Sequence, residues 1–384
     1  MRFREVFAVS LLLAAFQPAC ADERLAARVD REANRVMKAT GAKGLAIAVI
    51  EDGQVAFAQS YGQRNEAGAA LKRDTIMYGA SLTKAAFAYM VVQLVDERVI
   101  DLDTSIAKYL PKPLPDYPTE DKYASWSDLK GDERWRNLTP RILLSHSSGF
   151  HNFGFLESDQ KLRIHFEPGT RYSYSGDGFI LLQFVLERGL GLDVGHEMQR
   201  RVFDRFGMAN TSMIWRTGFA PNLADGWDLN GRVEPHDERS TVRAAGSMDT
   251  TIADIARFAA GYVRGDGLSS QARAELTRAQ MAITTASQFP VLQDEVAPDL
   301  RHKGLAAGLG VIVFDGPQGR GFQKGGHNDT TGNTLVCIEN GKRCVLILSN
   351  DVRAEAGFPA IVKVVLGETG MKWTWEYGAT PMLP

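Results

Sequence analysis

The order of strand and helix patterns along the chain limits the folds that it can adopt. Runs rich in β-branched and apolar residues lie towards both ends, at 45–62 and 305–349, while helical and loop-like patterns fill most of the middle. Strands so far apart in sequence share a sheet when both ends of the chain fold into one lobe. The order therefore predicts an α+β fold, in which residues 22–80 and 235–384 form an α/β lobe and residues 81–234 form an inserted, mainly helical lobe.

Two dipeptides predict hairpins within the strand-rich ends. Asp-Gly at 52–53 and Asn-Gly at 340–341 each separate two runs of strand-forming residues. Counting outward from the second turn places Cys337 opposite Cys344. In an oxidising compartment, cysteines opposed across a hairpin form a structural disulfide, and two buried free thiols are the alternative.

The first 21 residues have the pattern of a secretory signal peptide. A basic start precedes a short apolar run at 6–16, and Ala19 and Ala21 have the small-residue spacing of a cleavage site. We expect cleavage after Ala21, and a lipid anchor on Cys20 is the alternative. No other apolar run approaches the ~18 residues of a membrane-spanning helix. The pattern predicts a periplasmic or secreted protein whose mature form has no transmembrane anchor.

The charge balance argues against two classes of partner. The net charge is −2, and removal of the signal peptide takes away two Arg and one Glu, which moves it to about −3. A surface that binds nucleic acid or an anionic membrane needs an excess of Lys and Arg. We therefore expect no nucleic acid and no membrane surface as a partner.

A serine followed three residues later by a lysine occurs four times, at Ser81/Lys84, Ser105/Lys108, Ser127/Lys130 and Ser158/Lys161. Such a short motif is a hypothesis until its structural context is known. Polar, loop-like sequence follows Ser127 and Ser158. Ser105 begins a short segment that a proline stops, so its hydroxyl is expected to cap that segment. Only Ser81 precedes a long apolar run.

The run after Ser81 predicts a long amphipathic helix. Residues three apart share a helix face, so the Lys84 amine can reach the Ser81 hydroxyl. A serine at the start of a helix also lies beside free backbone N–H groups, which can stabilise an oxyanion. Ser81 and Lys84 are therefore the candidate nucleophile and its partner. A capping serine with a solvated lysine is the alternative.

Further segments match one family in order along nearly the whole mature chain. They are LLSHSSGF (143–150), EPGTRYSYSGDGFILL (167–182), VFDRFGMANTSM (202–213), RAAGSMDTTIADIARFA (243–259) and FQKGGHNDTTGN (322–333). Together with Ser81-x-x-Lys84, they resemble motifs of the serine β-lactamase and penicillin-binding-protein superfamily, in the branch of class C β-lactamases, D-peptidases and related esterases. The resemblance implies a β-lactamase/transpeptidase-like fold, with an antiparallel sheet flanked by helices and an inserted mainly helical domain.

The tyrosine motif of that family has two candidates here. Aligning GFILLQ with the family's GYxLLG makes Tyr174 the motif tyrosine and leaves Tyr172 as a packing residue. The same alignment places Gly176 where the family has an asparagine, whose amide hydrogen-bonds the catalytic lysine and the side-chain amide of a β-lactam. Glycine makes neither contact, so the resemblance implies better cleavage of simple esters than of penicillins. The vacant position is open to a water molecule or to His327.

The third motif of the family, Lys-Thr-Gly, also has two candidate registers. Lys324-Gly325-Gly326 supplies the lysine and the required glycine, whereas His327 and the two residues after it resemble a His-x-Gly variant. The lysine register keeps the spacing to the following strand and is preferred. The resemblance then implies that Lys324 attracts a substrate carboxylate. It also implies that the backbone N–H groups of Ser81 and His327 bind the oxyanion.

The resemblance implies an acyl-enzyme mechanism without a metal or an organic cofactor. Ser81 attacks a carbonyl, a neutral or proton-sharing Lys84 and a phenolate form of Tyr174 assist, and water releases the acyl group. The sequence has neither the H-E-x-x-H of a zinc protease nor the G-x-S-x-G of an α/β-hydrolase. Candidate substrates are β-lactams, D-amino-acid peptides or amides such as peptidoglycan peptides, and short-chain esters. A penicillin-binding cell-wall sensor that stays acylated is the alternative function.

Overall fold

The computed structural model describes residues 19–378 and 380–383 of the 384-residue chain. Of the predicted signal peptide, residues 1–18 lie outside this range. The helices are α1 (Ala19–Thr40), α2 (Leu82–Asp96), α3 (Pro140–Leu144), α4 (Gly176–Phe184), α5 (Val194–Met198), α6 (Ile252–Arg264), α7 (Ser270–Thr277), α8 (Phe358–Leu366) and α9 (Trp373–Tyr377). The strands are β1 (Gly44–Glu51), β2 (Gln54–Gly62), β3 (Met77–Tyr78), β4 (Gly226–Trp227), β5 (Val233–Glu234), β6 (Asp249–Thr250), β7 (Met281–Ala282), β8 (Ala306–Ala307), β9 (Ile312–Gly316), β10 (Gly319–His327), β11 (Gly332–Ile338) and β12 (Arg343–Ser349).

Both ends of the chain contribute to one large sheet. Its eight strands follow the order β2-β1-β12-β11-β10-β9-β8-β7, and every neighbouring pair is antiparallel. β1 pairs with β12, from the far end of the chain, with Leu45 opposite Ser349 and Ile50 opposite Cys344. The predicted α+β class with an antiparallel sheet is confirmed.

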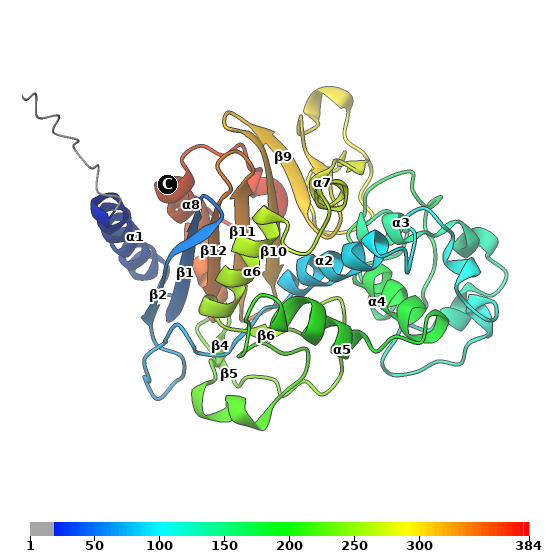
Figure 1. The fold of residues 1–384 in the computed structure, drawn as a ribbon, viewed down its shortest axis with the longest axis horizontal. Coiled ribbons are helices and arrows are strands. Elements are labelled where there is room, and N and C mark those ends of the chain that lie inside the picture. Colours follow the sequence, from blue (N-terminus) through cyan, green and yellow to red (C-terminus); the bar gives the residue numbers. More distant parts are fainter. Residues whose placement is uncertain (1–18, 379, 384) are drawn as a thin grey trace, which may run out of the picture.

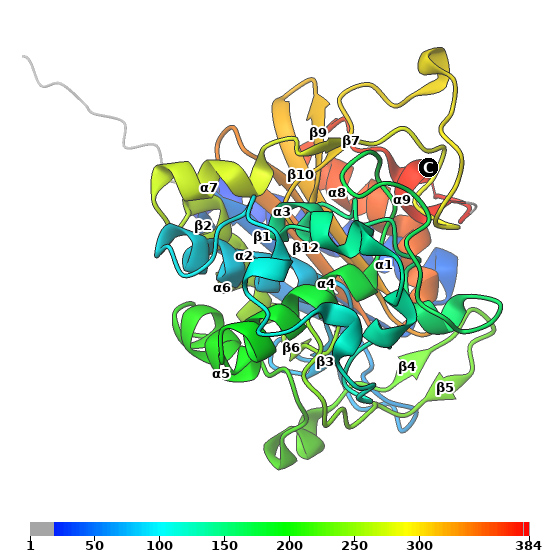
Figure 2. The ribbon, with the colours of Figure 1, turned by 90° about the vertical axis from the view of Figure 1, so that its right-hand side faces the viewer.

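Helices cover both faces of this sheet. Side chains alternate between the two faces along a strand. Leu45 and Ile47 of β1 therefore pack in the core beneath α1 and α8, whereas Ala46 and Ala48 pack in the core beneath α2 and α6. Figures 1 and 2 show α6 and α1 on opposite sides of the strands. Because both faces are buried, the strand is a continuous apolar run instead of an alternation of polar and apolar residues.

Both predicted hairpins form, but their turns differ. Asp52 and Gly53 have φ values of 48° and 71°, so both residues adopt the left-handed conformation that a two-residue Asp-Gly turn requires. In the second hairpin the positive φ values fall on Gly341 (77°) and Lys342 (47°), and not on Asn340. Asn340 and Gly341 are still the central residues of the turn, because the Lys342 N–H donates to the Glu339 carbonyl at 3.0 Å, and the strands keep the predicted register. The conformation of Asn340 differs from that of the expected Asn-Gly turn.

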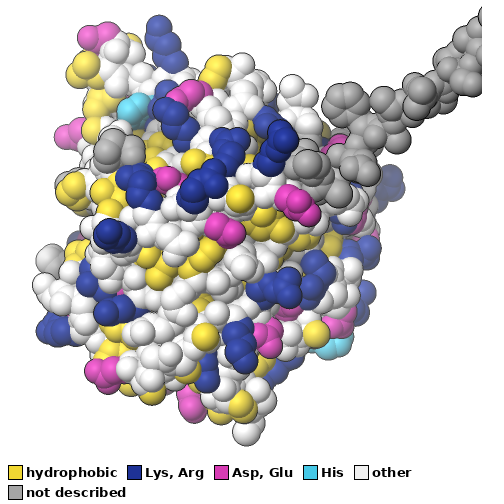
Figure 3. Space-filling view, turned by 90° about the vertical axis from the view of Figure 1, so that its left-hand side faces the viewer, with side chains coloured by type: hydrophobic (Ala, Val, Ile, Leu, Met, Phe, Trp, Pro, Cys, Tyr) yellow, Lys and Arg dark blue, Asp and Glu magenta, His cyan; other side chains and the backbone are white. Residues whose placement is uncertain are grey.

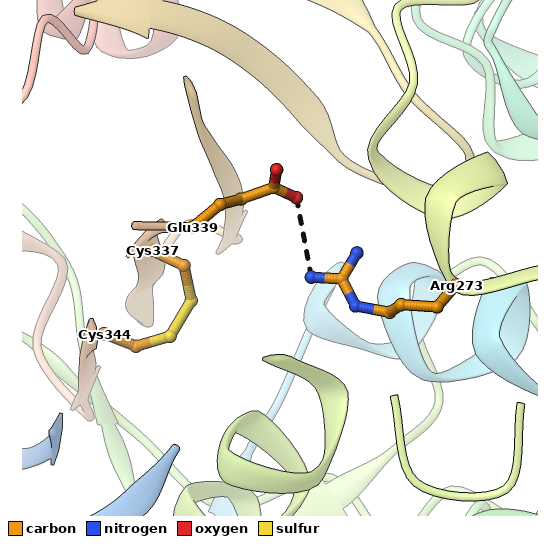
Figure 4. Close-up of a disulfide and its surroundings, with 4 residues drawn as sticks. All are labelled: Arg273, Cys337, Glu339 and Cys344. Atoms are coloured by element: carbon orange, nitrogen blue, oxygen red, sulfur yellow. Dashed lines mark hydrogen bonds and ion pairs between the residues drawn. A yellow bond between two sulfur atoms is a disulfide. The ribbon is translucent and has the colours of Figure 1, made fainter. Parts of the chain in front are cut away.

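The predicted disulfide joins β11 to β12. Cys337 and Cys344 face each other in the ladder and their sulfurs are bonded. In the turn beyond the bridge, the Glu339 carboxylate pairs with Arg273 of α7 at 3.5 Å and accepts a hydrogen bond from the Thr277 hydroxyl. Figure 4 shows the ion pair beside the disulfide. The hairpin is thus closed covalently across its strands and attached to a helix by polar contacts.

Helix α2 passes through the interior of the protein. Every residue from Leu82 to Leu94 is buried, including the polar side chains of Lys84 and Gln93. The predicted amphipathic character is therefore wrong, because this stretch has no face towards solvent. A helix that is buried on all sides is typical of the core of a large domain.

The middle of the chain lies beside the sheet as helices and long connections. Figure 1 places α3, α4 and α5 to one side of the strands, and Figure 2 views the molecule from that side. The bounds predicted for the two lobes, residues 22–80 with 235–384 and residues 81–234, stay a prediction.

The surface carries mixed charges. On the face drawn in Figure 3, Lys and Arg side chains are spaced among acidic and hydrophobic ones and do not gather into one patch. Among the residues that the structure describes, we find no helix of the length and apolar character that a membrane span needs.

Candidate active site

Ser81 stands at the N-terminal end of α2, directly after a strained residue. Ala80 is buried and has a φ of 46°, in the left-handed region that non-glycine residues rarely adopt. Strain of this kind persists where the surroundings enforce it, commonly at functional sites. The Ser81 side chain makes no capping hydrogen bond and is partly exposed. The Ser81 hydroxyl therefore does not cap the helix that it precedes.

Lys84 lies one turn into α2 and is only 1 % exposed. Its Nζ lies 3.0 Å from Ser81 Oγ and donates a 2.6 Å hydrogen bond to the backbone oxygen of Ala245. Burial and, less strongly, the charge of Lys324 hold the pKa of Lys84 well below its usual range. The lowered pKa favours the neutral form of this amine, which lies beside the hydroxyl and in that form can accept the serine proton. The alternative of a capping serine with a solvated lysine is wrong for this pair.

The other three Ser-x-x-Lys pairs lie away from the interior. Ser105 accepts a hydrogen bond from the Ala107 N–H at 3.2 Å, which is the capping role expected of it, and Lys108 is exposed. Both members of the pairs that begin at Ser127 and Ser158 are exposed. Of the four pairs, the one at the start of α2 has the buried amine that proton transfer needs.

Tyr174 reaches the same serine from the segment that leads into α4. Its hydroxyl donates a 2.8 Å hydrogen bond to Ser81 Oγ. Tyr172 lies elsewhere, because its hydroxyl donates to Gln288 Oε1 at 3.2 Å and its ring packs against Trp375. Of the two candidate tyrosines, Tyr174 is the one in contact with Ser81.

His146 supports this tyrosine and stays uncharged. The two rings stack with centroids 4.3 Å apart, and His146 Nδ1 accepts a 3.1 Å hydrogen bond from the Ser175 N–H. Burial lowers the pKa of His146 well below its usual range and raises the pKa of Tyr174. The resting site therefore holds a neutral phenol, and not the phenolate that the resemblance implies. The Lys84 amine is left as the available base.

Lys324 brings a second amine to the site from β10. Its Nζ lies 5.2 Å from the centroid of the Tyr174 ring and donates a 2.8 Å hydrogen bond to the Gly325 carbonyl. Burial lowers the pKa of Lys324 to about 8, an effect that the carboxylate of Glu376 opposes. Lys324 thus keeps its charge through neutral pH.

His327, the other candidate for the third motif, makes different contacts. Its Nδ1 lies 3.2 Å from Glu355 Oε1, and its side chain is 40 % exposed. Both Lys324 and His327 border the cleft. Of these two candidates, Lys324 is the one whose amine stands over the Tyr174 ring, beside that of Lys84, so the geometry favours the lysine register.

Gly326 allows β10 to pass very close to the start of α2. A Cβ atom here would lie 3.0 Å from both Gly79 O and Leu82 N, and 3.1 Å from Ser81 N, all closer than the 3.4–4 Å of ordinary contact. The strand and the backbone at the start of α2, including the Ser81 N–H, therefore bound a narrow space beside Ser81. Backbone N–H groups in such a space stabilise the negative charge that develops on a carbonyl oxygen.

Gly176 does not leave the vacancy expected of it. A Cβ atom at this position would lie 2.4 and 2.5 Å from Cε1 and Cζ of Phe153. The Gly176 N–H donates to the backbone oxygen of Asn152 (2.8 Å) and to its Oδ1 (2.9 Å), which attaches the loop to the start of α4. The expectation of a position open to water or to His327 is wrong, because an aromatic ring fills it.

These groups surround one cleft of about 640 Å³. Its other borders are the segments 237–247 and 288–289 and the loop residues Asn152, Phe153 and Phe155. No periodic pattern in the sequence marks Asn152, Phe153 or Phe155, so the sequence did not identify these three loop residues as borders of the cleft. His146 is different, since it lies inside the LLSHSSGF motif that the resemblance had singled out. Within the described part of the chain, no group of three or more His, Cys, Asp or Glu side chains could hold a metal ion.

Comparisons with known proteins relate this chain to one family. A family model described as Beta-lactamase matches residues 29–364. The chain is 24% identical over 314 residues to D-alanyl-D-alanine-carboxypeptidase/endopeptidase AmpH of Escherichia coli K12, covering 80% of this chain and 78% of that protein. It is 23% identical over 374 residues to Penicillin-binding protein 4 of Amycolatopsis lactamdurans, covering 89% of each.

Solved structures share the fold. The octameric penicillin-binding protein homologue from Pyrococcus abyssi has a TM-score of 0.69 at 18% identity, covering 90% of this chain and 78% of that chain. The D-alanine carboxypeptidase AmpC from Burkholderia cenocepacia has a TM-score of 0.69 at 17% identity, covering 90% of this chain and 99% of that chain. These likenesses confirm the predicted β-lactamase/transpeptidase-like architecture.

Proposed function

Because this chain belongs to the beta-lactamase family, we propose that it is a serine hydrolase that forms an acyl-enzyme at Ser81. One observation carries the proposal. Ser81 Oγ lies at the same time 3.0 Å from the buried Lys84 Nζ and 2.8 Å from the Tyr174 hydroxyl. A nucleophile within hydrogen-bond reach of a base and of a second proton carrier is the arrangement that acyl transfer needs.

Each of these residues has its own role in the proposed acyl transfer. Ser81 Oγ bonds to the substrate carbonyl carbon while its proton moves to the neutral amine of Lys84. The backbone N–H groups of Ser81 and His327 hold the oxyanion. As the intermediate collapses, the bond to the leaving group breaks, and the proton passes from Lys84 to that group by way of the Tyr174 hydroxyl. A water molecule then attacks the acyl carbon and gives its proton to Lys84. As the ester bond breaks, this proton passes to Ser81 Oγ, which restores the hydroxyl and releases the carboxylic acid.

The proposed substrates are carboxylic esters and amides, including D-amino-acid peptides and β-lactams. Support comes from the names of two relatives, a D-alanyl-D-alanine carboxypeptidase and a penicillin-binding protein. The Lys324 ammonium beside Tyr174 suits a substrate that carries a carboxylate. We place the enzyme in the periplasm or outside the cell, on the pattern of its first 21 residues.

Steady-state hydrolysis of p-nitrophenyl butyrate and of a penicillin tests the function. Ser81→Ala should lower kcat/KM by about 10³-fold or more. Lys84→Met, which keeps an unbranched buried side chain, should lower it by at least about 10²-fold. Ser105→Ala is the control and should leave it unchanged. Release of one equivalent of nitrophenol per enzyme without further turnover would contradict the hydrolase function. It would support the alternative, a cell-wall sensor that stays acylated.

A further inference from the structure

The loop that precedes α4 places two aromatic rings at the cleft. Phe153 and Phe155 stack with centroids 5.1 Å apart and planes 8° from parallel. Both border the cleft that contains Ser81, and Phe155 is 63% exposed there. A large exposed apolar side chain inside a cleft indicates a ligand surface more strongly than one on an open face.

Hydrogen bonds and close packing hold the first of these rings in place. The Asn152 oxygens accept the Gly176 N–H, and the Gly154 N–H donates a 2.6 Å bond to Asp177 Oδ2 on the same helix. Phe153 is therefore attached to α4 on both sides. Its ring lies over Gly176, where any larger residue would clash with it.

The position of the rings relates them to the reacting atoms. Gly176 is two residues beyond Tyr174, whose hydroxyl contacts Ser81 Oγ. By contrast, the segment 237–247 that also borders the cleft contributes Asp237, Arg239 and Arg243. The cleft thus has a pair of stacked aromatic rings at the loop before α4 and a border with charged side chains at the segment 237–247.

We propose that Phe153 and Phe155 form an apolar subsite for the acyl group that becomes attached to Ser81. This inference rests on the proposed function and specifies its substrate class. The enzyme selects esters and amides whose acyl group is an alkyl chain of several carbons or an arylalkyl group. An acyl group that needs an amide donor at position 176 is a poor substrate, since a hydrocarbon ring occupies that place.

A series of p-nitrophenyl esters with one leaving group and different acyl groups tests the subsite. In the wild type, kcat/KM should rise at least about tenfold from acetate to hexanoate, because each buried methylene adds to binding. Phe153→Ala should lower the hexanoate value about 10- to 100-fold and the acetate value by less than about threefold. Phe155→Ala, a truncation at an exposed position, should act in the same direction and keep the fold intact. Leu156→Ala is the matched control, because Leu156 is an exposed apolar residue of the same loop that does not border the cleft.

A second arm restores the amide. Gly176→Asn in the Phe153→Ala background should raise penicillin turnover relative to hexanoate, whereas Gly176→Asn alone should lower both through the clash. A flat acyl series in the wild type, or equal losses on acetate and hexanoate in both Phe variants, would overturn the subsite while Ser81 remained acylated. Absence of any acylation at Ser81 would overturn the proposed function and the subsite together.

Discussion

Replacing Gly326 with alanine tests the close approach of β10 to the start of α2. The added methyl would lie 3.0 Å from Gly79 O and Leu82 N and 3.1 Å from Ser81 N, where ordinary contacts begin at 3.4 Å. All three neighbours are backbone atoms, so the strand and the helix start must separate by about 0.4 Å or more. Overpacking of this kind costs about 1–3 kcal/mol of stability.

The catalytic loss should be larger than the loss in stability suggests. The space that opens is the one in which the N–H groups of Ser81 and His327 would hold the oxyanion. Removal of one such donor typically lowers kcat by about 10²–10³-fold. Since these contacts form mainly in the transition state, kcat for p-nitrophenyl butyrate should fall by that amount while KM changes little.

The assay combines steady-state kinetics with thermal melting of the same preparation. Gly218→Ala is the control, because a methyl at Gly218 would meet nothing within 4 Å. The control should keep both kcat and melting temperature. A folded Gly326→Ala protein whose kcat stays within about threefold of the wild type would refute the reasoning that this spacing forms the oxyanion site.

Three further predictions follow from charges and cross-links. Burial lowers the pKa of Lys324 to about 8, so its ammonium is present below that pH and lost above it. The kcat/KM for a penicillin should therefore fall above pH 8, while that for a neutral p-nitrophenyl ester, corrected for spontaneous hydrolysis, should not; parallel profiles would contradict this role. Burial raises the pKa of Asp177 from 3.8 to about 7, so the stability linked to its protonation is full below pH 4 and lost as the pH rises to 7 and above. Asp177→Asn should thus raise the melting temperature more at pH 8 than at pH 4. The difference between the two pH values corresponds to at most about 4 kcal/mol in the free energy of unfolding. An equal effect at both pH values would exclude this effect of the Asp177 carboxyl. Replacing Cys337 and Cys344 with alanine should cost about 2–3 kcal/mol, given the short loop that their bridge closes, and leave kcat within about twofold; unchanged stability would show that the bridge contributes nothing.

Local patterns predicted those parts of the fold that depend on neighbouring residues. The register of the β11–β12 hairpin follows from counting outward from one turn, and it placed Cys337 opposite Cys344 correctly. The Ser81–Lys84 contact is of the same kind, because residues three apart share a helix face in any α-helix. Tyr174 and Lys324 needed the family resemblance, since nothing in their own segments relates them to Ser81.

Tertiary packing decided what the sequence did not reveal. Whether a helix such as α2 has a solvent face depends on the elements that surround it, and here they cover it entirely. The charge state of Tyr174 depends on its burial beside His146. Likewise, the ring of Phe153 lies over Gly176 because two loops meet at the start of α4. From sequence alone, Gly176 indicates only that the family's asparagine side chain is missing. The sequence does not identify Phe153 as the residue whose ring fills that space.

The most direct test of the central claim is to locate the acyl group. Rapid acid quenching of the enzyme during turnover of p-nitrophenyl butyrate, followed by intact-mass measurement and peptide fragmentation, identifies the acylated residue. The account predicts one butyryl group per chain, on Ser81, that disappears once substrate is exhausted and is absent from Ser81→Ala. A butyryl group on any other residue, or equal labelling of the Ser81→Ala protein, would contradict it.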